Sequence, residues 1–391
     1  MIKMYQIQCL NKISSVGLAR FGDNYTCGED IANPDAIMVR SASMHEMELP
    51  SSLLAIARAG AGVNNIPLEK CSEQGIVVFN TPGANANAVK ELVITALLMT
   101  SRKIVPGIEW VKTLKGNGDA VSKMVEKGKS AFVGPEISGK KLGVIGLGAI
   151  GILVANAAKS LGMEVYGYDP YLSVDAAWGL SRSTKHARTL DEIFTECDYI
   201  TLHVPLTPDT KEMINAGTLA QMKDGVRILN FARGDLVESE AIVKALNDGK
   251  VAAYATDFAS EDLIDVEGVL ITPHLGASTP ESEDNCARMA ANELIDYLEN
   301  GNIKNSVNMP SVSMPRMYAT RICLLHHNVP NTISNLSGAM ADHGINIEDM
   351  QSKSKKDYAY TIVDVSNEVS DEIVPYLKKL PGIINVRVIK D

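Results

Sequence analysis

The stretch that decides the fold is LGVIGLGAIG, at residues 142–151. It opens on Leu142–Ile145, a short apolar run of the kind that forms a buried strand. Three glycines then follow in the spacing GxGxxG, at Gly146, Gly148 and Gly151. The first permits a tight turn, the second lets the backbone approach a pyrophosphate, and the third lets a helix pack on the strand. The pattern predicts a dinucleotide-binding loop.

The residues after this loop favour NAD as the dinucleotide. A helix is expected to begin near Ile150, where its N-terminus would offer free N–H groups to the phosphates. The next apolar run, Val165–Tyr168, ends directly before Asp169, which follows Gly146 by 23 residues. An acid about 20 residues after the loop binds the ribose hydroxyls and repels the 2′-phosphate of NADP.

Apolar runs of strand length alternate with helix-period segments on both sides of the loop. Several runs are apolar throughout, as expected for strands of a parallel sheet covered on both faces. This alternation predicts a doubly wound α/β architecture. The expected strands are Ala36–Val39, Leu54–Ala57, Ile76–Phe79, Leu142–Ile145, Val165–Tyr168, Tyr199–Leu202, Arg227–Phe231, Ala252–Thr256 and Val269–Thr272.

The C-terminal segment has a different order of elements. Residues 302–315 are rich in Asn, Ser, Met and Pro, and they predict a linker. The elements beyond it follow the order βαββαβ, which predicts a small ferredoxin-like domain. Their expected bounds are Ala319–Leu325, Thr332–His343, Ile345–Ser352, Tyr358–Asp364, Asp371–Leu380 and Val386–Ile389.

Composition excludes several other classes of protein. The chain has 391 residues, enough for two or three domains, with 46% hydrophobic and 21% charged residues. A formal net charge of −10 argues against a nucleic-acid partner. The longest strongly apolar stretch, near Leu92–Met99, is too short to span a membrane. The six cysteines are scattered without a CxxC pair, so no metal site is expected and a reduced, cytoplasmic location is the simplest interpretation.

Polar residues follow the later strands, where catalytic groups of such sheets lie. Oxidation of a 2-hydroxy acid needs a cation for the carboxylate, and Arg233 after its strand suits this. It also needs a base near neutral pKa for the hydroxyl proton, which His274 can supply, with His203 as a rival. An acid beside the base would orient it, and Glu261 and Asp262 are the candidates.

Six segments resemble the D-isomer-specific 2-hydroxyacid dehydrogenase family, in the order in which that family carries them. They are GVIGLGAIG (143–151), YGYDP (166–170), HVPLTPDT (203–210), LNFARGDLVE (229–238), YATDF (254–258) and ITPHLGAST (271–279). The resemblance implies that Arg233 anchors the substrate carboxylate and that His274 is the general acid/base. It implies NAD as cofactor, bound by Gly146, Gly148, Ile150, Gly151, Asp169, His203, Pro205, Ala232, Asp257 and Gly276.

The chain departs from the family at the catalytic acid. Many relatives have Asp-Val-Phe-x-x-Glu-Pro, whereas this chain has DFASED at residues 257–262. If the two patterns are aligned with a one-residue gap, Glu261 matches the catalytic Glu of the family. If they are aligned without a gap, Asp262 matches it. We favour Glu261 and keep Asp262 as its rival.

The N-terminal segments resemble the family members that act on 3-phosphoglycerate. They are VRSAS (39–43), ARAGAGVNNIP (57–67) and FNTPGANANAVKE (79–91). The resemblance implies that Arg40 contacts the substrate phosphate and that backbone N–H groups of Ala61, Gly62 and Val63 bind its carboxylate. The implied reaction is NAD-dependent oxidation of 3-phosphoglycerate to 3-phosphohydroxypyruvate, in serine biosynthesis. The alternatives are another 2-hydroxy acid, such as glycerate or D-lactate, and a non-enzymatic NADH-sensing protein of the same fold.

The resemblance also implies three domains. Two are Rossmann-like, a substrate-binding domain of residues 1–95 with about 285–310 and an NAD-binding domain of residues 96–284. Residues 317–391 resemble an ACT domain, an amino-acid-binding regulatory module. In serine-inhibited relatives a His and two Asn bind L-serine, which here implies His326, Asn328 and Asn346. An ACT domain that serves assembly alone is the alternative, and a homodimer or homotetramer is expected.

Overall fold

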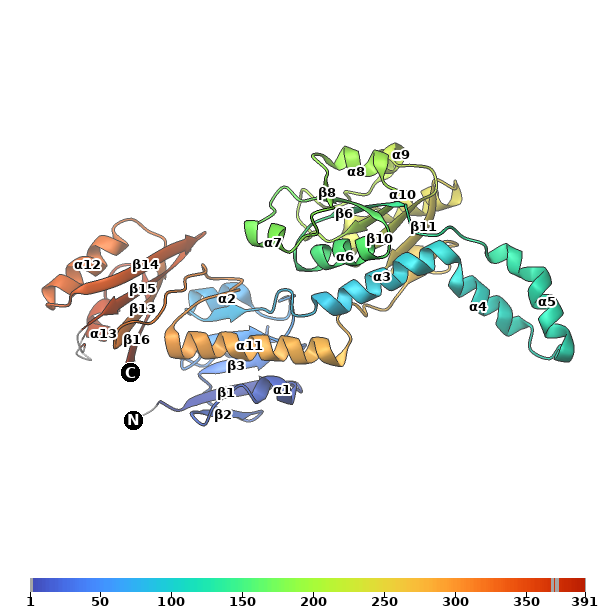
Figure 1. Cartoon of the computed structure of the whole chain (residues 1–391). Coiled ribbons are helices and arrows are strands. Elements are labelled where there is room, and N and C mark those ends of the chain that lie inside the picture. Colours follow the sequence, from blue (N-terminus) through green and yellow to red (C-terminus); the bar gives the residue numbers. More distant parts are fainter. Residues whose placement is uncertain (1–2, 367–368, 370–372, 391) are drawn as a thin grey trace. The chain divides into compact units, whose positions relative to one another are not determined.

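The structure is a computed structural model of the chain (Figure 1). The chain separates into two compact units, one of residues 1–85 with 280–391 and the other of residues 86–279. Of the helices over the described residues, none is long and apolar enough to cross a membrane. The residues that the structure describes are 3–366, 369 and 373–390.

The division between the units differs from the expected domain boundaries at residues 95 and 285. The helix α3 (Ala86–Arg102) lies entirely in the second unit, because it packs on α6 (Ala149–Ser160) and on two strands of the sheet there. The C-terminal domain belongs to the first unit, because the two share a hydrophobic core.

The second unit is built on a parallel sheet of seven strands in the order β12-β11-β10-β9-β6-β7-β8. Each crossover between parallel strands needs a connection that returns along the sheet, and most of these connections carry a helix. The strands are β6 (Lys141–Ile145), β7 (Glu164–Tyr168), β8 (Lys185–His186), β9 (Tyr199–Leu202), β10 (Val226–Asn230), β11 (Val251–Thr256) and β12 (Val269–Ile271). The remaining α-helices that cover the sheet are α7 (Val174–Trp178), α8 (Leu190–Glu196), α9 (Ala216–Gln221) and α10 (Ser239–Asn247).

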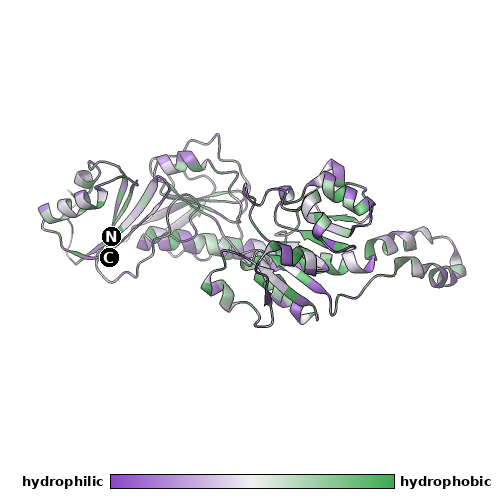
Figure 2. Ribbon diagram, turned by 90° about the horizontal axis from the view of Figure 1, so that it is seen from above, coloured by the Kyte–Doolittle hydropathy of each residue, from purple (hydrophilic) through white to green (hydrophobic). Residues whose placement is uncertain are grey.

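Burial explains why these strands are apolar throughout. Every residue of β9 is buried, and separate hydrophobic clusters form on the two faces of the sheet. Figure 2 shows hydrophobic residues along the strands and mixed colours on the helices. The predicted doubly wound parallel sheet is therefore confirmed for this unit.

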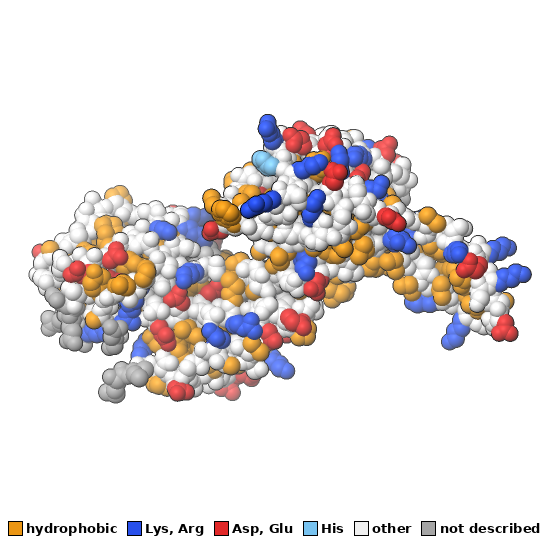
Figure 3. Space-filling model, viewed as in Figure 1, with side chains coloured by type: hydrophobic (Ala, Val, Ile, Leu, Met, Phe, Trp, Pro, Cys, Tyr) orange, Lys and Arg blue, Asp and Glu red, His pale blue; other side chains and the backbone are white. Residues whose placement is uncertain are grey.

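The part of the chain that connects α3 to β6 forms an arm that projects from the second unit. It has no buried residue in either of its α-helices, although Trp110 and Phe132 pack with ring centroids 5.2 Å apart. Figure 3 shows hydrophobic side chains on its surface among lysines and arginines. Its elements are α4 (Ile104–Thr113), η1 (Gly118–Ala120), α5 (Val121–Gly128) and η2 (Lys129–Phe132).

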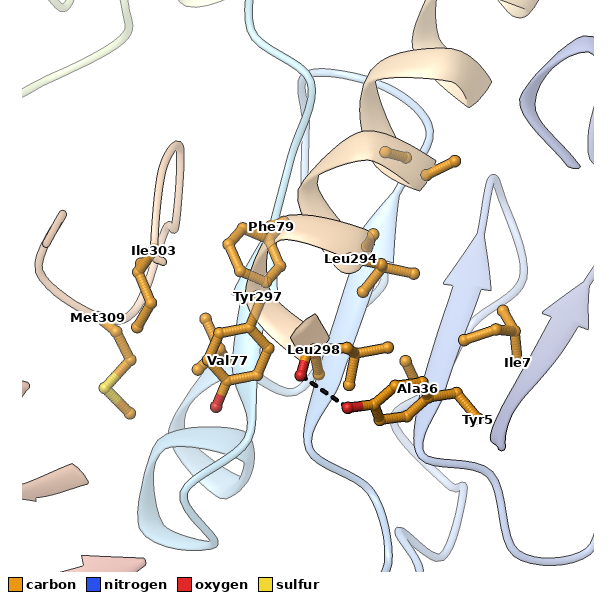
Figure 4. Close-up of a cluster of buried hydrophobic side chains, with 14 of the residues drawn as sticks. Tyr5, Ile7, Ala36, Val77, Phe79, Leu294, Tyr297, Leu298, Ile303 and Met309 are labelled. Carbon is orange, nitrogen blue, oxygen red and sulfur yellow. Dashed lines mark hydrogen bonds between the residues drawn. The ribbon is translucent and has the colours of Figure 1, made fainter. Parts of the chain in front are cut away.

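The first unit contains a second parallel sheet, of five strands in the order β2-β1-β3-β4-β5. The long helix α11 (Pro280–Asn300) packs on it, and Phe79 and Tyr297 meet with ring centroids 5.7 Å apart (Figure 4). The Tyr5 hydroxyl donates to the Leu298 carbonyl at 2.9 Å across this core. The other elements are β1 (Tyr5–Leu10), α1 (Ser15–Leu18), β2 (Tyr25–Gly28), β3 (Ala36–Val39), β4 (Ala55–Arg58), α2 (Leu68–Glu73) and β5 (Val77–Phe79).

The C-terminal domain has the predicted βαββαβ order. Its four strands form an antiparallel sheet in the order β14-β15-β13-β16. The start of the predicted helix Asp371–Leu380 lies outside the described residues, and the helix is present from Ile373. The elements are β13 (Thr320–His327), α12 (Thr332–Asp342), β14 (Ile347–Lys355), β15 (Tyr358–Val365), α13 (Ile373–Leu377) and β16 (Ile383–Lys390).

The core that the C-terminal sheet shares with the five-stranded parallel sheet joins them into one unit. Leu325 and Tyr360 belong to the same buried cluster as Phe79. The fully buried Arg321 forms a bidentate pair with Asp364, at 2.6 and 2.7 Å. The same guanidinium donates to backbone carbonyls of the segment that joins α11 to β13, so the linker is fixed to the domain.

Candidate active site

The glycine loop of the second unit has the geometry that its spacing predicted. Gly146 has a φ of 92°, and a Cβ added there would lie 2.5 Å from the His203 carbonyl oxygen. A Cβ on Gly151 would lie 1.9 Å from the Gly146 carbonyl oxygen. A Cβ on Gly148 would meet no described atom within 4 Å. Two of the glycines are thus required by packing, while Gly148 borders open space where a phosphate group fits.

The helix behind the loop adds the electrostatics that an anion needs. The helix α6 begins directly after Gly148, which has no side-chain cap, and its first turn contains no acidic residue. The N–H groups of that turn therefore lack a capping side chain and attract negative charge. Ile150, half-buried in the same turn, lies among the apolar residues packed on this face of the sheet.

Asp169 lies at the end of β7, beside the loop. One carboxylate oxygen accepts from the Leu147 N–H and the other from the Tyr171 N–H, both at 2.8 Å. Each oxygen keeps a further lone pair, so the carboxylate can still accept from hydroxyl groups of a ribose. The loop, helix and acid fit a bound NAD.

His203 follows β9 and lies against the glycine loop. Its ring atom Nε2 hydrogen-bonds the Thr201 hydroxyl at 2.9 Å, and its backbone N–H donates to the Ile145 carbonyl at 2.7 Å. Burial lowers the pKa of His203 to about 3, because the charged imidazolium is poorly solvated there. A ring with so low a pKa is a weak base near pH 7, which disfavours His203 as the rival of His274 for proton transfer.

Two other predicted cofactor residues, Pro205 and Ala232, follow neighbouring strands at the same edge of the sheet. Pro205 is exposed after β9, and its carbonyl accepts from the Thr210 hydroxyl at 2.6 Å. Ala232 is half-buried after β10, and its N–H donates to the Asn230 side chain at 3.2 Å. Because β9 lies beside β6 in the sheet, these turns gather near the glycine loop.

Asp257, predicted to bind cofactor, holds the loop that carries His274. It is 2% exposed. Its carboxylate accepts from the Thr272 hydroxyl at 2.5 Å and from the N–H groups of Leu275 and Gly276, both at 2.8 Å. These three hydrogen bonds, made by a buried carboxylate, fix the geometry of the loop. Gly276 is part of this hydrogen-bonded loop, and a Cβ there would lie 3.2 Å from the Asp257 carboxylate.

The catalytic candidates of the second unit lie on adjacent loops. His274 is exposed, has the left-handed φ of 56°, and packs on Phe258 with ring centroids 5.2 Å apart. Arg233 is exposed and its guanidinium donates to the Ala232 carbonyl at 2.6 Å. Both side chains are therefore accessible to a substrate anion.

The two predicted partners of His274 lie side by side in one short helix. Glu261 and Asp262 are both exposed, in the short 3-10 helix η4 (Glu261–Leu263). Across the residues that the structure describes, neither forms a hydrogen bond or ion pair with His274. The pairing stays a prediction.

The glycine loop of the first unit presents backbone donors. Among the described residues, the N–H groups of Ala61, Gly62 and Val63 donate no hydrogen bond. Arg58 at the end of β4 lies beside them, since a Cβ on Gly62 would lie 3.8 Å from its guanidinium. Such a run of free N–H groups beside a cation is an anion-binding arrangement. Arg58 was missed as a site residue, although an arginine directly after a strand and before a glycine loop was a usable signal.

Arg40, predicted to contact the substrate phosphate, is paired with an acidic side chain. Its guanidinium forms an ion pair with Glu283 of α11 at 2.5 Å, and both side chains are nearly half exposed. Arg58 donates to the Arg40 carbonyl at 3.1 Å, which brings the two arginines close together. Glu283 is 243 residues away in sequence, and no local pattern could have indicated the pair.

The predicted effector residues are only partly brought together. His326 and Asn328 line one pocket of about 300 Å³ in the C-terminal domain. The His326 ring hydrogen-bonds the His327 carbonyl and the Thr361 hydroxyl, and burial lowers its pKa. Asn346 does not line this pocket, and its side chain donates to Glu348 at 2.9 Å.

The fold and the glycine loop define an NAD-binding protein of the Rossmann type. The family model described as "D-isomer specific 2-hydroxyacid dehydrogenase, NAD binding domain" matches residues 94–276. Those residues include the loop, Arg233 and His274.

Individual relatives agree with this family. The chain is 33% identical to D-3-phosphoglycerate dehydrogenase of Haemophilus influenzae over 355 residues, which are 88% of this chain and 83% of that protein. It is 37% identical to D-3-phosphoglycerate dehydrogenase of Synechocystis over 316 residues, which are 78% of this chain. The chain spans about half the length of that second relative, 54%.

A solved structure supports the same assignment. The NAD+-bound 3-phosphoglycerate dehydrogenase of Entamoeba histolytica is similar with a TM-score of 0.59 and 26% identity, covering 78% of this chain and 99% of that one. The chain belongs to the D-isomer-specific 2-hydroxyacid dehydrogenase family and is an NAD-dependent dehydrogenase.

Proposed function

We propose that the chain oxidises 3-phosphoglycerate to 3-phosphohydroxypyruvate with NAD, in serine biosynthesis. The observation that carries this choice of substrate is the anion-binding loop of the first unit. It offers three free backbone N–H groups and two adjacent arginines, which exceeds the need of a lone carboxylate. The names of the relatives support the same substrate.

The proposal assigns each end of the substrate to different residues. In the first unit, Arg40 and Arg58 are assigned to the phosphate, and the N–H groups of residues 61–63 are assigned to the carboxylate. In the second unit, the guanidinium of Arg233 is assigned to the carboxylate. A guanidinium suits a carboxylate or phosphate because its donors match two oxygens at once. For a phosphate to bind Arg40, it must compete with Glu283.

The reaction moves one hydride and one proton. NAD, bound by the glycine loop and Asp169, would supply the acceptor for the hydride that leaves C2 of the substrate. His274 accepts the proton of the 2-hydroxyl group as the C–O bond becomes a carbonyl, and it returns that proton in the reverse direction. Glu261, or Asp262 in its place, would stabilise the imidazolium after it has formed. Asp257 keeps His274 in position through the loop from Thr272 to Gly276.

The test is the oxidation of NADH with three 2-keto acids. The catalytic efficiency kcat/KM should be far higher with 3-phosphohydroxypyruvate than with hydroxypyruvate or pyruvate. His274→Gln should reduce it by roughly 100-fold to 10,000-fold, whereas the exposed His186→Gln serves as a matched control without effect. Equal efficiency with pyruvate would reject the phosphorylated substrate, and full activity of His274→Gln would reject the acid/base role.

We also propose that the C-terminal domain is an ACT domain that binds L-serine in the pocket lined by His326 and Asn328. The pocket volume of about 300 Å³ suits a small amino acid. L-Serine should lower the rate of the wild-type chain and lose this effect in Asn328→Ala. An unchanged rate with serine would favour an ACT domain that serves assembly alone.

We further propose a cytoplasmic homodimer or homotetramer in which the α4–α5 arm contacts a second copy. Ile108 and Val111 of α4 are 51% and 50% exposed, and the arm buries no residue of these helices by itself. An apolar surface of this kind is usually covered by a partner. Ile108→Glu combined with Val111→Glu should shift the mass in solution toward the monomer, and an unchanged mass would exclude the arm.

A further inference from the structure

A polar pocket of about 290 Å³ lies along α11, and none of its lining residues belongs to the sites of catalysis, cofactor or effector binding. One wall is a single face of the helix, and the other is the segment after it, at residues 302–305. The charged side chains of the pocket and the amide beside them are Arg288, Glu293, Asp296, Lys304 and Asn305.

Glu293 is the buried acid of this pocket and is incompletely satisfied. It is 8% exposed, and one of its carboxylate oxygens accepts from the Asn305 side chain at 2.8 Å. The other oxygen, Oε2, is buried and finds no hydrogen-bond partner in the described part of the chain. Burial raises the pKa of Glu293 to about 8, because the charged carboxylate is poorly solvated. Buried polar atoms are rarely left without a partner, so a donor entering from the pocket would complete this group.

The other charges of the pocket leave one cation unmatched. Asp296 accepts from Asn302 at 2.8 Å and pairs with Lys304 at 3.2 Å, which neutralises both. Arg288 donates to the neutral Asn285 side chain at 3.0 Å. Within the described ranges it forms no ion pair. The pocket thus offers the incompletely paired carboxyl group of Glu293 and the guanidinium of Arg288, and a cationic group bound at Glu293 would favour the charged form of that carboxyl.

Both residues line the pocket, and their positions set the scale of the ligand. They are five positions apart on one helix, a rise of about 7.5 Å along its axis. A small α-amino acid carries an ammonium and a carboxylate, and with a charge-assisted hydrogen bond of about 2.8 Å at each end it spans a comparable length. A metal ion fits poorly, since no group of three or more His, Cys, Asp or Glu among the described residues could hold one.

We infer that this pocket binds a small α-amino acid, with its ammonium on Glu293 and its carboxylate on Arg288. The site is separate from the proposed serine pocket of the C-terminal domain and does not depend on the identity of the dehydrogenase substrate.

The test is titration calorimetry on the full-length chain carrying Asn328→Ala, which removes the C-terminal pocket from the measurement. The probes are glycine and L-alanine as zwitterions, methylammonium and acetate as their separate halves, and glycerol as a neutral polyol. Glycine and L-alanine should bind more tightly than either half, and glycerol should not bind. Absence of glycine and L-alanine binding, or tighter binding of glycerol, would overturn the inference.

Two variants assign the ends of the ligand. Glu293→Gln keeps the size and the acceptor for Asn305, and it should weaken glycine and methylammonium at least about tenfold. Arg288→Ala should weaken glycine but leave methylammonium unchanged. The control is Glu281→Gln, which removes the same charge from an exposed position of the same helix and should change nothing.

The outcomes are decisive even if one variant fails to fold. Arg288 is exposed, so its replacement does not disturb the core and can be measured alone. Glycine binding that is indifferent to Arg288→Ala, or equally affected by Glu281→Gln and Glu293→Gln, would reject the site.

Discussion

The two glycine loops of this chain, at residues 146–151 and 60–63, resemble each other in their backbone donors and differ in the source of their positive charge. Each follows a strand of a parallel sheet and has backbone N–H groups that could bind an anion. The first loop is backed by the 12-residue helix α6, so its positive potential comes from aligned peptide dipoles. The second has no helix directly behind it and depends on the side chains of Arg58 and Arg40.

This difference explains which loop a sequence reveals. A helix-backed loop needs glycines at fixed spacing, because backbone collides with backbone, and the spacing is visible in the sequence. A loop supported by side chains depends on residues brought close by the fold, such as Glu283 beside Arg40. Four predictions test how far this contrast holds.

The largest effect is expected from Gly151→Ala in the helix-backed loop. Its new Cβ would lie 1.9 Å from the Gly146 carbonyl oxygen, so the backbone must shift. The free energy of unfolding should fall by about 3 kcal/mol and NADH affinity by roughly 100-fold, measured by denaturation and fluorescence titration. Gly148→Ala meets no described atom, so it should lower NADH affinity at unchanged stability. Wild-type affinity of Gly148→Ala would mean that the phosphates do not approach there.

The second prediction concerns Arg58, which supports the other loop. Arg58→Leu should lower kcat/KM for 3-phosphohydroxypyruvate by roughly 10-fold to 100-fold, because charge-assisted hydrogen bonds are lost. NADH affinity should not change, and Arg58→Lys should recover part of the loss. A drop in NADH affinity equal to the loss of kcat/KM would show that the variant disturbs the whole fold.

The third prediction uses His203, which packs behind the helix-backed loop. Its pKa of about 3 in the folded chain lies below the ordinary value near 6.5 of the unfolded chain. The unfolded state therefore binds the proton first, and stability present above pH 6.5 is lost as the pH falls toward 3. Between pH 6.5 and 5 the loss should be about 2 kcal/mol, measured by urea unfolding.

The matched variant for this prediction is His203→Asn, which cannot titrate. It should remove that part of the pH dependence of stability. An unchanged stability profile would mean that His203 titrates normally in the folded chain.

The smallest effect is expected at the Arg40–Glu283 pair. Glu283→Gln removes the carboxylate that, under the proposed function, competes with the substrate phosphate for Arg40. An exposed pair of this kind contributes up to about 1 kcal/mol, so KM for the phosphorylated substrate should fall by roughly twofold to fivefold. The change should disappear in an Arg40→Ala background. A rise in KM would show that Glu283 orients Arg40 for binding.

Much of the fold could be predicted from the sequence because its causes are local. The parallel strands are apolar throughout because both faces are covered, and the βαββαβ order of the C-terminal domain follows from periodicity alone. The loop from Gly146 to Gly151 and its partner Asp169 were found in the same way.

The parts that were not predicted depend on tertiary contacts. The role of Asp257 as the tie of the His274 loop arises from hydrogen bonds to residues 15 to 19 positions away. The boundary at Ala86 depends on what α3 packs against, and its sequence fits either unit. The burial of Glu293 could not be predicted from the sequence, because a single acid in an amphipathic helix is ordinarily exposed.

The buried pair of Arg321 and Asp364 couples the unfolding of the C-terminal domain to that of the rest of the first unit. The Arg321 guanidinium holds the linker, and Leu325 and Tyr360 complete the core of the five-stranded sheet. We therefore expect that the C-terminal domain does not unfold separately from that sheet. Amide protons of β1 and β13 should exchange with solvent at a common slow rate, through one cooperative unfolding event. A protease cut in the linker would then yield two fragments that stay associated, and neither would be an independent folding unit.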